Sequence, residues 1–448
     1  MGLCDILRDM NRGERSVDIG ARVVGVAVRH PERLQLRAER WKDGMKPQID
    51  ELYGSEVKAT IDRFVENDPE GISRRLRWAL EELRDMESIQ VPGHEWAHIA
   101  DTMAAIIYGF EEGNFSPGEK LEVILANALH DTGRAVEKVK NQPDFKDKAE
   151  DALFPILIGF RLQQKYGAIP EKLGWRILYA ITSNSQPSTD YPTVGLVHGS
   201  DRLQLVGSFT MGRGWPYDVV MGKRRIMVPN DSARMTQIPR PNTDGDISQL
   251  GQYEFYMRCV FPAQTREGQG RLDEARAENA VILMLSTEGN EETHKQIFAP
   301  ELGLVDKTHW SKKRLPEGMY ESAVTQKAGF VEFLDKINLS PTTDVDGLMN
   351  LMNQIMKVEK LAVPDDLDQV MREKLGELSD QERINQWRIM MYTITKRHAH
   401  RVRDLDVVNK YLPKADKVSR VTAELVKTEF EDRERLYREE FPNLPEFK

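Results

Sequence analysis

Apolar residues recur every three or four positions along much of the chain, which is the spacing of one face of an α-helix. In residues 1–88 this spacing is carried by Ile61, Phe64, Leu76, Leu80 and Leu83, with charged residues between them. The pattern predicts an N-terminal region of amphipathic helices without candidate chemistry. Residues 89–210 are denser in apolar positions and contain all of the motifs considered below.

The pattern changes after residue 210. Between 211 and 271, Gly, Pro, Asn and Asp recur, and short runs of β-branched and aromatic residues alternate with these turn signals. We expect a small β-containing insertion there. Helical spacing returns from Leu272 to Ser286 and again from about Gly318, which predicts a helical C-terminal domain over 272–448. The expected fold class is therefore mainly α, with a helical core over 89–210.

Composition and charge favour a folded, cytoplasmic protein. Of the 448 residues, 40% are hydrophobic and 30% charged, which is ordinary for globular domains. The net charge of -9 gives no overall attraction to nucleic acid or an anionic membrane, and no apolar run approaches membrane-spanning length. Only Cys4 and Cys259 occur, which excludes a disulfide framework and suits a reducing compartment. A homo-oligomer is left open.

The first motif with candidate chemistry contains two histidines. His94-Glu95-Trp96-Ala97-His98 follows a Pro-Gly pair, which commonly precedes a helix. Positions i and i+4 lie one helical turn apart, so we expect the imidazoles of His94 and His98 to share a face. The same helix should bury a stripe formed by Ile99, Met103, Ile106 and Phe110.

The second motif places a histidine next to an aspartate. His130 and Asp131 follow a helical stripe of Leu121, Ile124, Leu125 and Ala128, and Gly133 is expected to end that helix. A neutral imidazole nitrogen and a carboxylate oxygen together suit a borderline divalent cation.

The third motif places one acidic residue in an apolar run. Asp201 lies within residues 196–205, which are otherwise largely apolar, and we expect it near the beginning of a helix. A buried carboxylate without a partner costs several kcal/mol, so Asp201 should meet a cation or a metal ion.

In their order along the chain, these segments resemble the HD-domain phosphohydrolase family. Residues 94–99 are similar to the HDxxHxxRV form of its first motif, 129–134 to its LHDIGK/R motif and 200–203 to its ADRL motif. The resemblance covers roughly residues 91–210. It implies that this region folds as the helical HD core.

The resemblance also implies a site and a reaction. His98, His130, Asp131 and Asp201 would hold one divalent ion, and Mn, Fe, Ni, Mg and Zn are not distinguished. His94, Asp131 and Arg134 would take part in catalysis, with Arg134 either binding a substrate phosphate or pairing within the chain. The implied reaction is hydrolysis of a phosphate mono- or diester by water activated on the ion. The implied partner is a small phosphorylated substrate, nucleotide-like in the family.

Two departures limit the match to the family pattern, and the second of them favours a single ion. Asp101-Thr102 stands where Arg-Val usually follows the first ligand, which removes a positive charge. Binuclear members carry two more histidines, and the plausible positions here read Glu150-Asp151 and Ser183-Asn184. A carboxylate at 150 or 151 could still serve a second ion.

Two other functions compete with this interpretation. Residues 94–98 also match HExxH, the zinc metalloprotease motif in which the glutamate activates water, here Glu95. A protease of that type needs another acidic ligand, for which Glu111, Glu112, Glu119 and Glu122 are available. Alternatively, a degenerate HD domain could bind metal and act as a regulatory module.

Basic runs outside the core raise the question of nucleic-acid binding. Residues 396–403 are densely basic, and Lys223-Arg224-Arg225 forms a smaller run. Each could contact phosphates, or it could form a solvated helix face or pair with acids of the same chain. We favour a solvated helix face or pairing with acids of the same chain.

Overall fold

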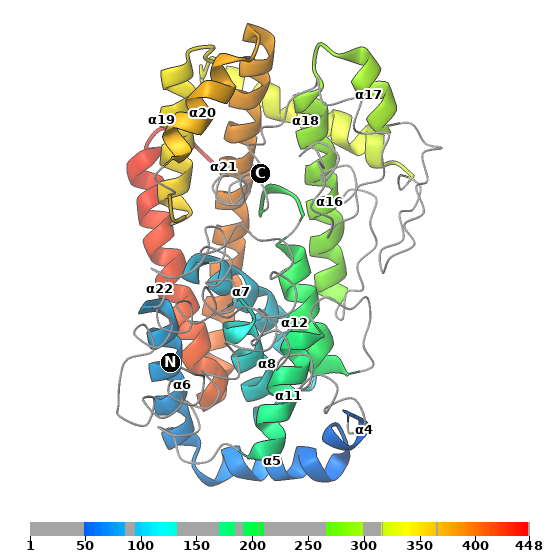
Figure 1. The fold of residues 1–448 in the computed structure, drawn as a ribbon, viewed down its shortest axis with the longest axis vertical. Coiled ribbons are helices and arrows are strands. Elements are labelled where there is room, and N and C mark those ends of the chain that lie inside the picture. Colours follow the sequence, from blue (N-terminus) through cyan, green and yellow to red (C-terminus); the bar gives the residue numbers. More distant parts are fainter. Residues whose placement is uncertain are drawn as a thin grey trace, which may run out of the picture. The chain divides into compact units, whose positions relative to one another are not determined.

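The structure is a computed structural model that describes residues 49–85, 95–131, 170–183, 191–204, 206–209, 266–298, 315, 317–363 and 366–446. These residues form helices and connecting turns, and none of them lies in a β-strand (Figure 1). The expected mainly α class is confirmed for this part of the chain. None of the helices described is long and apolar enough to cross a membrane.

The chain divides into two compact units. Unit one comprises residues 1–200, 264–267 and 407–429, and unit two comprises 201–263, 268–406 and 430–448. Four helices continue unbroken through the divisions: α12 (Pro192–Leu203), α16 (Arg266–Ser286), α21 (Asp380–Tyr411) and α22 (Lys417–Glu440). Asp201 is therefore held by a helix that begins in unit one.

Helix α8 (Pro117–Leu129) lies at the centre of unit one. Every residue from Leu121 to Leu129 is buried, as expected for a helix that is largely apolar all round. It begins with a capping box, in which Ser116 and Glu119 satisfy each other's backbone N–H groups. It packs against α5 (Ser55–Asn67), α7 (Trp96–Glu112) and α11 (Glu171–Thr182). The unit also contains α4 (Ile49–Leu52) and α6 (Pro69–Asp85).

Unit two has its own apolar core. Buried residues of α16 and α21 form it together with α18 (Met319–Lys336), α19 (Val345–Val358) and α20 (Leu367–Gly376). Helix α17 (Glu291–Phe298) adds Ile297 and Phe298 to this core, and the end of α22 adds Tyr437. A short 3-10 helix, η6 (Leu412–Lys414), follows α21 in unit one.

The stripes predicted for two helices are confirmed. Ile99, Met103 and Ile106 of α7 are almost fully buried, and so are Leu121 and Ile124 of α8. These two stripes hold together the helices that carry the first candidate ligands.

Several expected helix ends are wrong. Helix α8 stops at Leu129 with His130 as its C-cap, and does not extend to Gly133. Asp201 lies near the end of α12 and not near the beginning of a helix. Helix α16 begins at Arg266, before the predicted Leu272, so the last residues assigned to the β-containing insertion are helical. The rest of that insertion, residues 211–265, lies outside the described residues.

The basic run of α21 pairs with acids of the same chain. Arg397 and Arg401 are buried and donate hydrogen bonds to Glu359. His400 Nε2 lies 2.7 Å from Glu278 Oε1. For these residues, the prediction of an intrachain partner is confirmed. Lys223-Arg224-Arg225 lies outside the described residues.

Candidate metal centre

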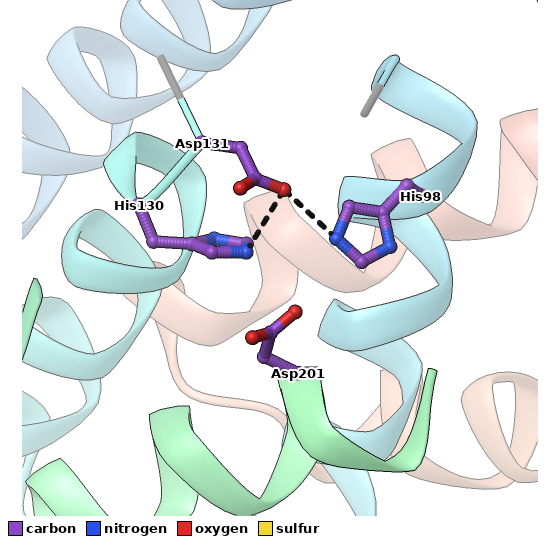
Figure 2. A group of neighbouring side chains, drawn as sticks. All are labelled: His98, His130, Asp131 and Asp201. Atoms are coloured by element: carbon purple, nitrogen blue, oxygen red, sulfur yellow. Dashed lines mark ion pairs between the residues drawn. The ribbon is translucent and has the colours of Figure 1, made fainter. Parts of the chain in front are cut away.

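The four predicted ligands lie together in the structure. His98 is in the first turn of α7, His130 caps α8, Asp131 follows it and Asp201 is in the last turn of α12. Each offers one ligand atom, and these atoms all lie within 4.8 Å of one another. Figure 2 shows the two imidazoles and the Asp201 carboxylate directed toward one region beneath Asp131. Three segments widely separated in the sequence thus meet at one point.

One carboxylate oxygen lies between the two imidazoles. Asp131 Oδ2 is 3.0 Å from His98 Nε2 and 3.1 Å from His130 Nε2 (Figure 2). The rings themselves are 5.5 Å apart between centroids and inclined at 64°. Both imidazoles therefore present the same nitrogen, Nε2, toward the carboxylate.

A backbone contact indicates which ring nitrogen of His130 carries the proton. Its Nδ1 lies 2.6 Å from the carbonyl oxygen of Asn127. A carbonyl oxygen can only accept a hydrogen bond, so Nδ1 must carry the proton and a neutral His130 has a lone pair on Nε2. That lone pair faces the Asp131 oxygen, and two acceptors at this separation require a shared proton or metal ion.

Burial strengthens this requirement. The exposed fractions are 2% for His98, 7% for His130 and 3% for Asp131, so water screens their charges weakly. The Asp131 carboxylate is costly in such surroundings unless a cation compensates it, and the partly buried Asp201 adds a second negative charge nearby. Two imidazole nitrogens and two carboxylate oxygens form a donor set that suits Mn, Fe, Ni or Zn, and such imidazoles commonly donate their other N–H to a carbonyl. The residues present fit a divalent metal ion.

Residues outside the predicted ligand set connect the helices that carry the candidate ligands. Asn127 supplies the carbonyl to His130, and its side chain donates to Thr102 Oγ1 of α7 at 2.9 Å. Glu122 of α8 accepts from Thr193 of α12 at 2.7 Å. The position of Asn127, three residues before a histidine at a helix end, is the signal that could have identified the carbonyl contact.

A second group with metal-ligand chemistry lies in unit two. Atoms of Glu274, Glu278 and His400 are also within 4.8 Å of one another. Arg403, however, lies among them, with Nη2 2.8 Å from His400 Nδ1 and Nη1 2.6 Å from Glu274 Oε2. Glu278 also accepts from the backbone N–H and the hydroxyl of Ser208. This fixed guanidinium already supplies the positive charge, so the group is a polar network that links α16 to α21.

Several predicted residues are not tested by the structure. His94 and Arg134 lie outside the described residues, as do Glu150, Asp151 and Asn184. Glu95 is fully buried at the N-cap of α7, and Ser183 is buried at the C-cap of α11. The roles assigned to His94 and Arg134 stay predictions.

Fold and site together define the class: a mainly α protein with a buried His/Asp group that could hold a metal ion. Comparison of the chain with protein-family models, with curated proteins and with solved structures found no match. A more specific function is therefore argued from the site and the motifs.

Proposed function

We propose that the chain is a metal-dependent phosphohydrolase of the HD type, which hydrolyses a phosphate mono- or diester of a nucleotide-like small molecule. The observation that carries the proposal is the convergence of four candidate ligands, since the ligand atoms of His130, Asp131 and two further residues all lie within 4.8 Å of one another. His98 and Asp201 complete the ligand set. The order of the three motifs supports the reaction class, and the nucleotide-like substrate rests on the family resemblance alone.

The chain's residues would bind and orient the ion. A divalent ion held here supplies Lewis-acid chemistry, which lowers the pKa of water and polarises a phosphoryl oxygen. The Asn127 carbonyl keeps Nε2 of His130 available as a ligand. Asp131 and Asp201 offset part of the ion's charge, and burial strengthens that attraction. We assign assistance in substrate binding or proton transfer to His94 and Arg134.

Contacts of the glutamates argue against the protease alternative. Glu119 belongs to the capping box of α8 and also pairs with Lys58. Glu122 pairs with Arg176 at 2.6 Å, and Glu111 pairs with Lys414 at 2.5 Å. The described partners of His98 are instead the residues of the HD-like set. This arrangement favours a phosphohydrolase.

The decisive experiment measures metal content and turnover on the same preparation. Purified protein is analysed by elemental mass spectrometry and assayed with nucleotides and generic phosphate mono- and diesters, with and without added Mn, Ni or Mg. We expect a single bound ion per chain and metal-dependent release of phosphate or alcohol. Glu95→Gln should retain the metal, because Glu95 is outside the proposed ligand set.

Three outcomes would contradict the proposal. Absence of both bound metal and turnover would remove its basis. Cleavage of casein without esterase activity would favour the HExxH protease. A bound ion without turnover on any phosphate ester would favour a regulatory module.

A further inference from the structure

Two buried threonines connect α8 to the other helices that carry candidate ligands. Thr102 of α7 lies four residues after His98 and accepts a hydrogen bond from Asn127 Nδ2 at 2.9 Å. Its hydroxyl donates to the Ile99 carbonyl at 2.8 Å, which holds it in the orientation that accepts from Asn127. Asn127 is the residue whose carbonyl accepts from His130. One side chain thus links the helix of His98 to the backbone that orients His130.

The second connection joins α8 and α12. Thr193 Oγ1 donates to Glu122 Oε1 at 2.7 Å, and both residues are almost fully buried. The other oxygen of Glu122 is 2.6 Å from Arg176 of α11, so the carboxylate is held in place.

The Thr193–Glu122 contact lies at the same sequence distance from the candidate ligand on each of the two helices. Glu122 precedes His130 by the same number of residues as Thr193 precedes Asp201. Eight helical residues rise about 12 Å, so both helices travel the same distance from the Thr193–Glu122 bond to their ligands. The Thr193–Glu122 bond therefore sets how far α12 is shifted along its axis against α8, and with it the position of Asp201 relative to His130.

We propose that Thr102 and Thr193 are positioning residues for the metal centre: their hydroxyls set the spacing of α7 and α12 against α8, and thereby the affinity for the ion. This inference rests on the proposed function, because it presupposes a metal at His98, His130, Asp131 and Asp201. Ligands must be held within about 0.5 Å of a productive arrangement, which packing alone does not ensure.

The experiment replaces each hydroxyl by a methyl group. Thr102→Val and Thr193→Val keep the shape and β-branching of the side chain but remove the hydrogen bond. Thr395→Val is the matched control, since Thr395 is equally buried but its hydroxyl bonds, among the residues that the structure describes, to carbonyls of its own helix. Thr102→Ser and Thr193→Ser retain the hydroxyl and serve as rescue variants.

The experiment measures Co²⁺ binding to the full chain. Calorimetry gives the affinity, and the visible absorption of the bound ion reports its ligand geometry. Because outer-shell contacts typically contribute 10–100-fold in metal affinity, we expect a loss of that order in each valine variant, with an altered Co²⁺ spectrum. The serine variants and Thr395→Val should bind as the wild type does. Thermal unfolding of the metal-free proteins should show a modest loss for Thr395→Val and larger losses for Thr102→Val and Thr193→Val, because these two remove a buried partner of Asn127 and of Glu122.

Two results would overturn the inference and can be told apart. Unchanged Co²⁺ affinity and spectrum in both Thr102→Val and Thr193→Val would refute the positioning role and leave the proposed function intact. Absence of Co²⁺ binding by the wild-type chain, with no other divalent ion bound, would refute the proposed function and the inference with it. If a valine variant does not fold, the Ser and Ala variants at the same position make the same comparison.

Discussion

At the scale of the residue, the candidate centre depends on where single protons and charges lie. The Asn127 carbonyl determines which nitrogen of His130 is protonated, and Asp131 places one oxygen between two imidazoles. These contacts could not be read from the motif, since the sequence identifies which residues can be ligands but not which nitrogen each presents. That the four candidate residues lie together could be predicted because three motifs in order constrain them together.

The sharpest test of the ligand set is Asp131→Asn. The substitution keeps the size of the side chain but removes its charge, so the affinity for a divalent ion should fall by more than the 10–100-fold typical of outer-shell changes. Metal content after dialysis against a weak chelator measures the effect. Asp273→Asn is the control, because Asp273 is exposed, contacts Gln269 and Arg276 of its own helix and is not among the candidate ligands, so metal content should be unchanged. Equal metal retention in both variants would exclude Asp131 as a ligand.

A glycine beyond α12 tests the anchoring of the segment that follows Asp201. Gly207 has a φ of +69°, and an added Cβ would lie 2.7 Å from Glu278 Oε2 and 2.9 Å from the Ala275 carbonyl. Gly207→Ala should therefore lower the free energy of unfolding by about 1–3 kcal/mol, as measured by denaturant titration.

The control for this substitution is Gly270→Ala. Gly270 lies inside α16, where an added Cβ meets nothing within 4 Å. Alanine should stabilise that helix by about 0.5–1 kcal/mol. The two changes are chemically identical, so a difference in sign isolates the backbone conformation at 207. Equal effects at both sites would show that the conformation at 207 is not constrained.

At the scale of the element, apolar spacing predicted the helices well and their ends less well. The stripes of α7 and α8 could be predicted because long periodic segments identify a buried face. The end of α8 could not, because Gly133 is only one of the residues that can end a helix, and here His130 adopts the C-cap. Asp201 lies near the end of α12 because Leu196 and Val197, on its N-terminal side, already belong to the buried helix.

The basic run of α21 illustrates what spacing cannot provide. Arg397 and Arg401 of α21, and Arg433 of α22, all donate to the carboxylate of Glu359, which caps the end of α19. Nothing in the local sequence of 396–403 identifies Glu359 as the partner, because the pairing spans three helices. A basic run on a solvated helix face and one in a buried ion-pair network can have the same amino-acid sequence.

Glu359→Gln tests how far this network stabilises unit two. It leaves three buried guanidiniums around a neutral amide, and removing one partner of a buried ion pair typically costs 3–5 kcal/mol. The expected result is a lower midpoint of urea unfolding, with α19, α21 and α22 affected together. Glu332→Gln removes an exposed ion pair with Lys336 and should leave the midpoint nearly unchanged. A midpoint equally insensitive to both changes would contradict the proposed role of Glu359.

At the scale of the whole molecule, buried carboxylates link stability to pH. Burial alone would raise the pKa of Glu278, but the charge of His400 and its hydrogen bond outweigh burial and lower the pKa from 4.5 to about 2. Burial also acts to raise the pKa of Glu359, and the charges of Arg397, Arg433 and Arg401 lower it well below its usual range. Each group is thus charged in the folded chain at pH values where the unfolded chain is protonated.

The sign of the effect follows from these shifts. A carboxyl whose pKa is lowered by folding contributes stability that is complete above its unfolded pKa and is lost as the pH falls toward its folded pKa. For Glu278 this window runs from 4.5 down to about 2 and corresponds to a loss on the order of 3 kcal/mol. Glu122 has the opposite shift, because burial raises its pKa above 4.5. Its contribution to the pH dependence of stability therefore falls above pH 4.5, outside the acid window of Glu278. The lowered groups therefore determine stability on the acid side.

We accordingly expect the urea midpoint of the metal-free chain to fall steeply below about pH 4.5, because Glu278 and Glu359 become protonated in the unfolded chain while both stay charged in the folded chain; for Glu278 this loss is complete near pH 2. Metal-free protein is used so that loss of a bound ion on acidification does not contribute to the slope. Glu278→Gln should be less stable near neutral pH and should lose less stability on acidification, because its side chain cannot titrate. Parallel pH profiles for the wild type and this variant would show that Glu278 does not carry the expected share of the acid sensitivity.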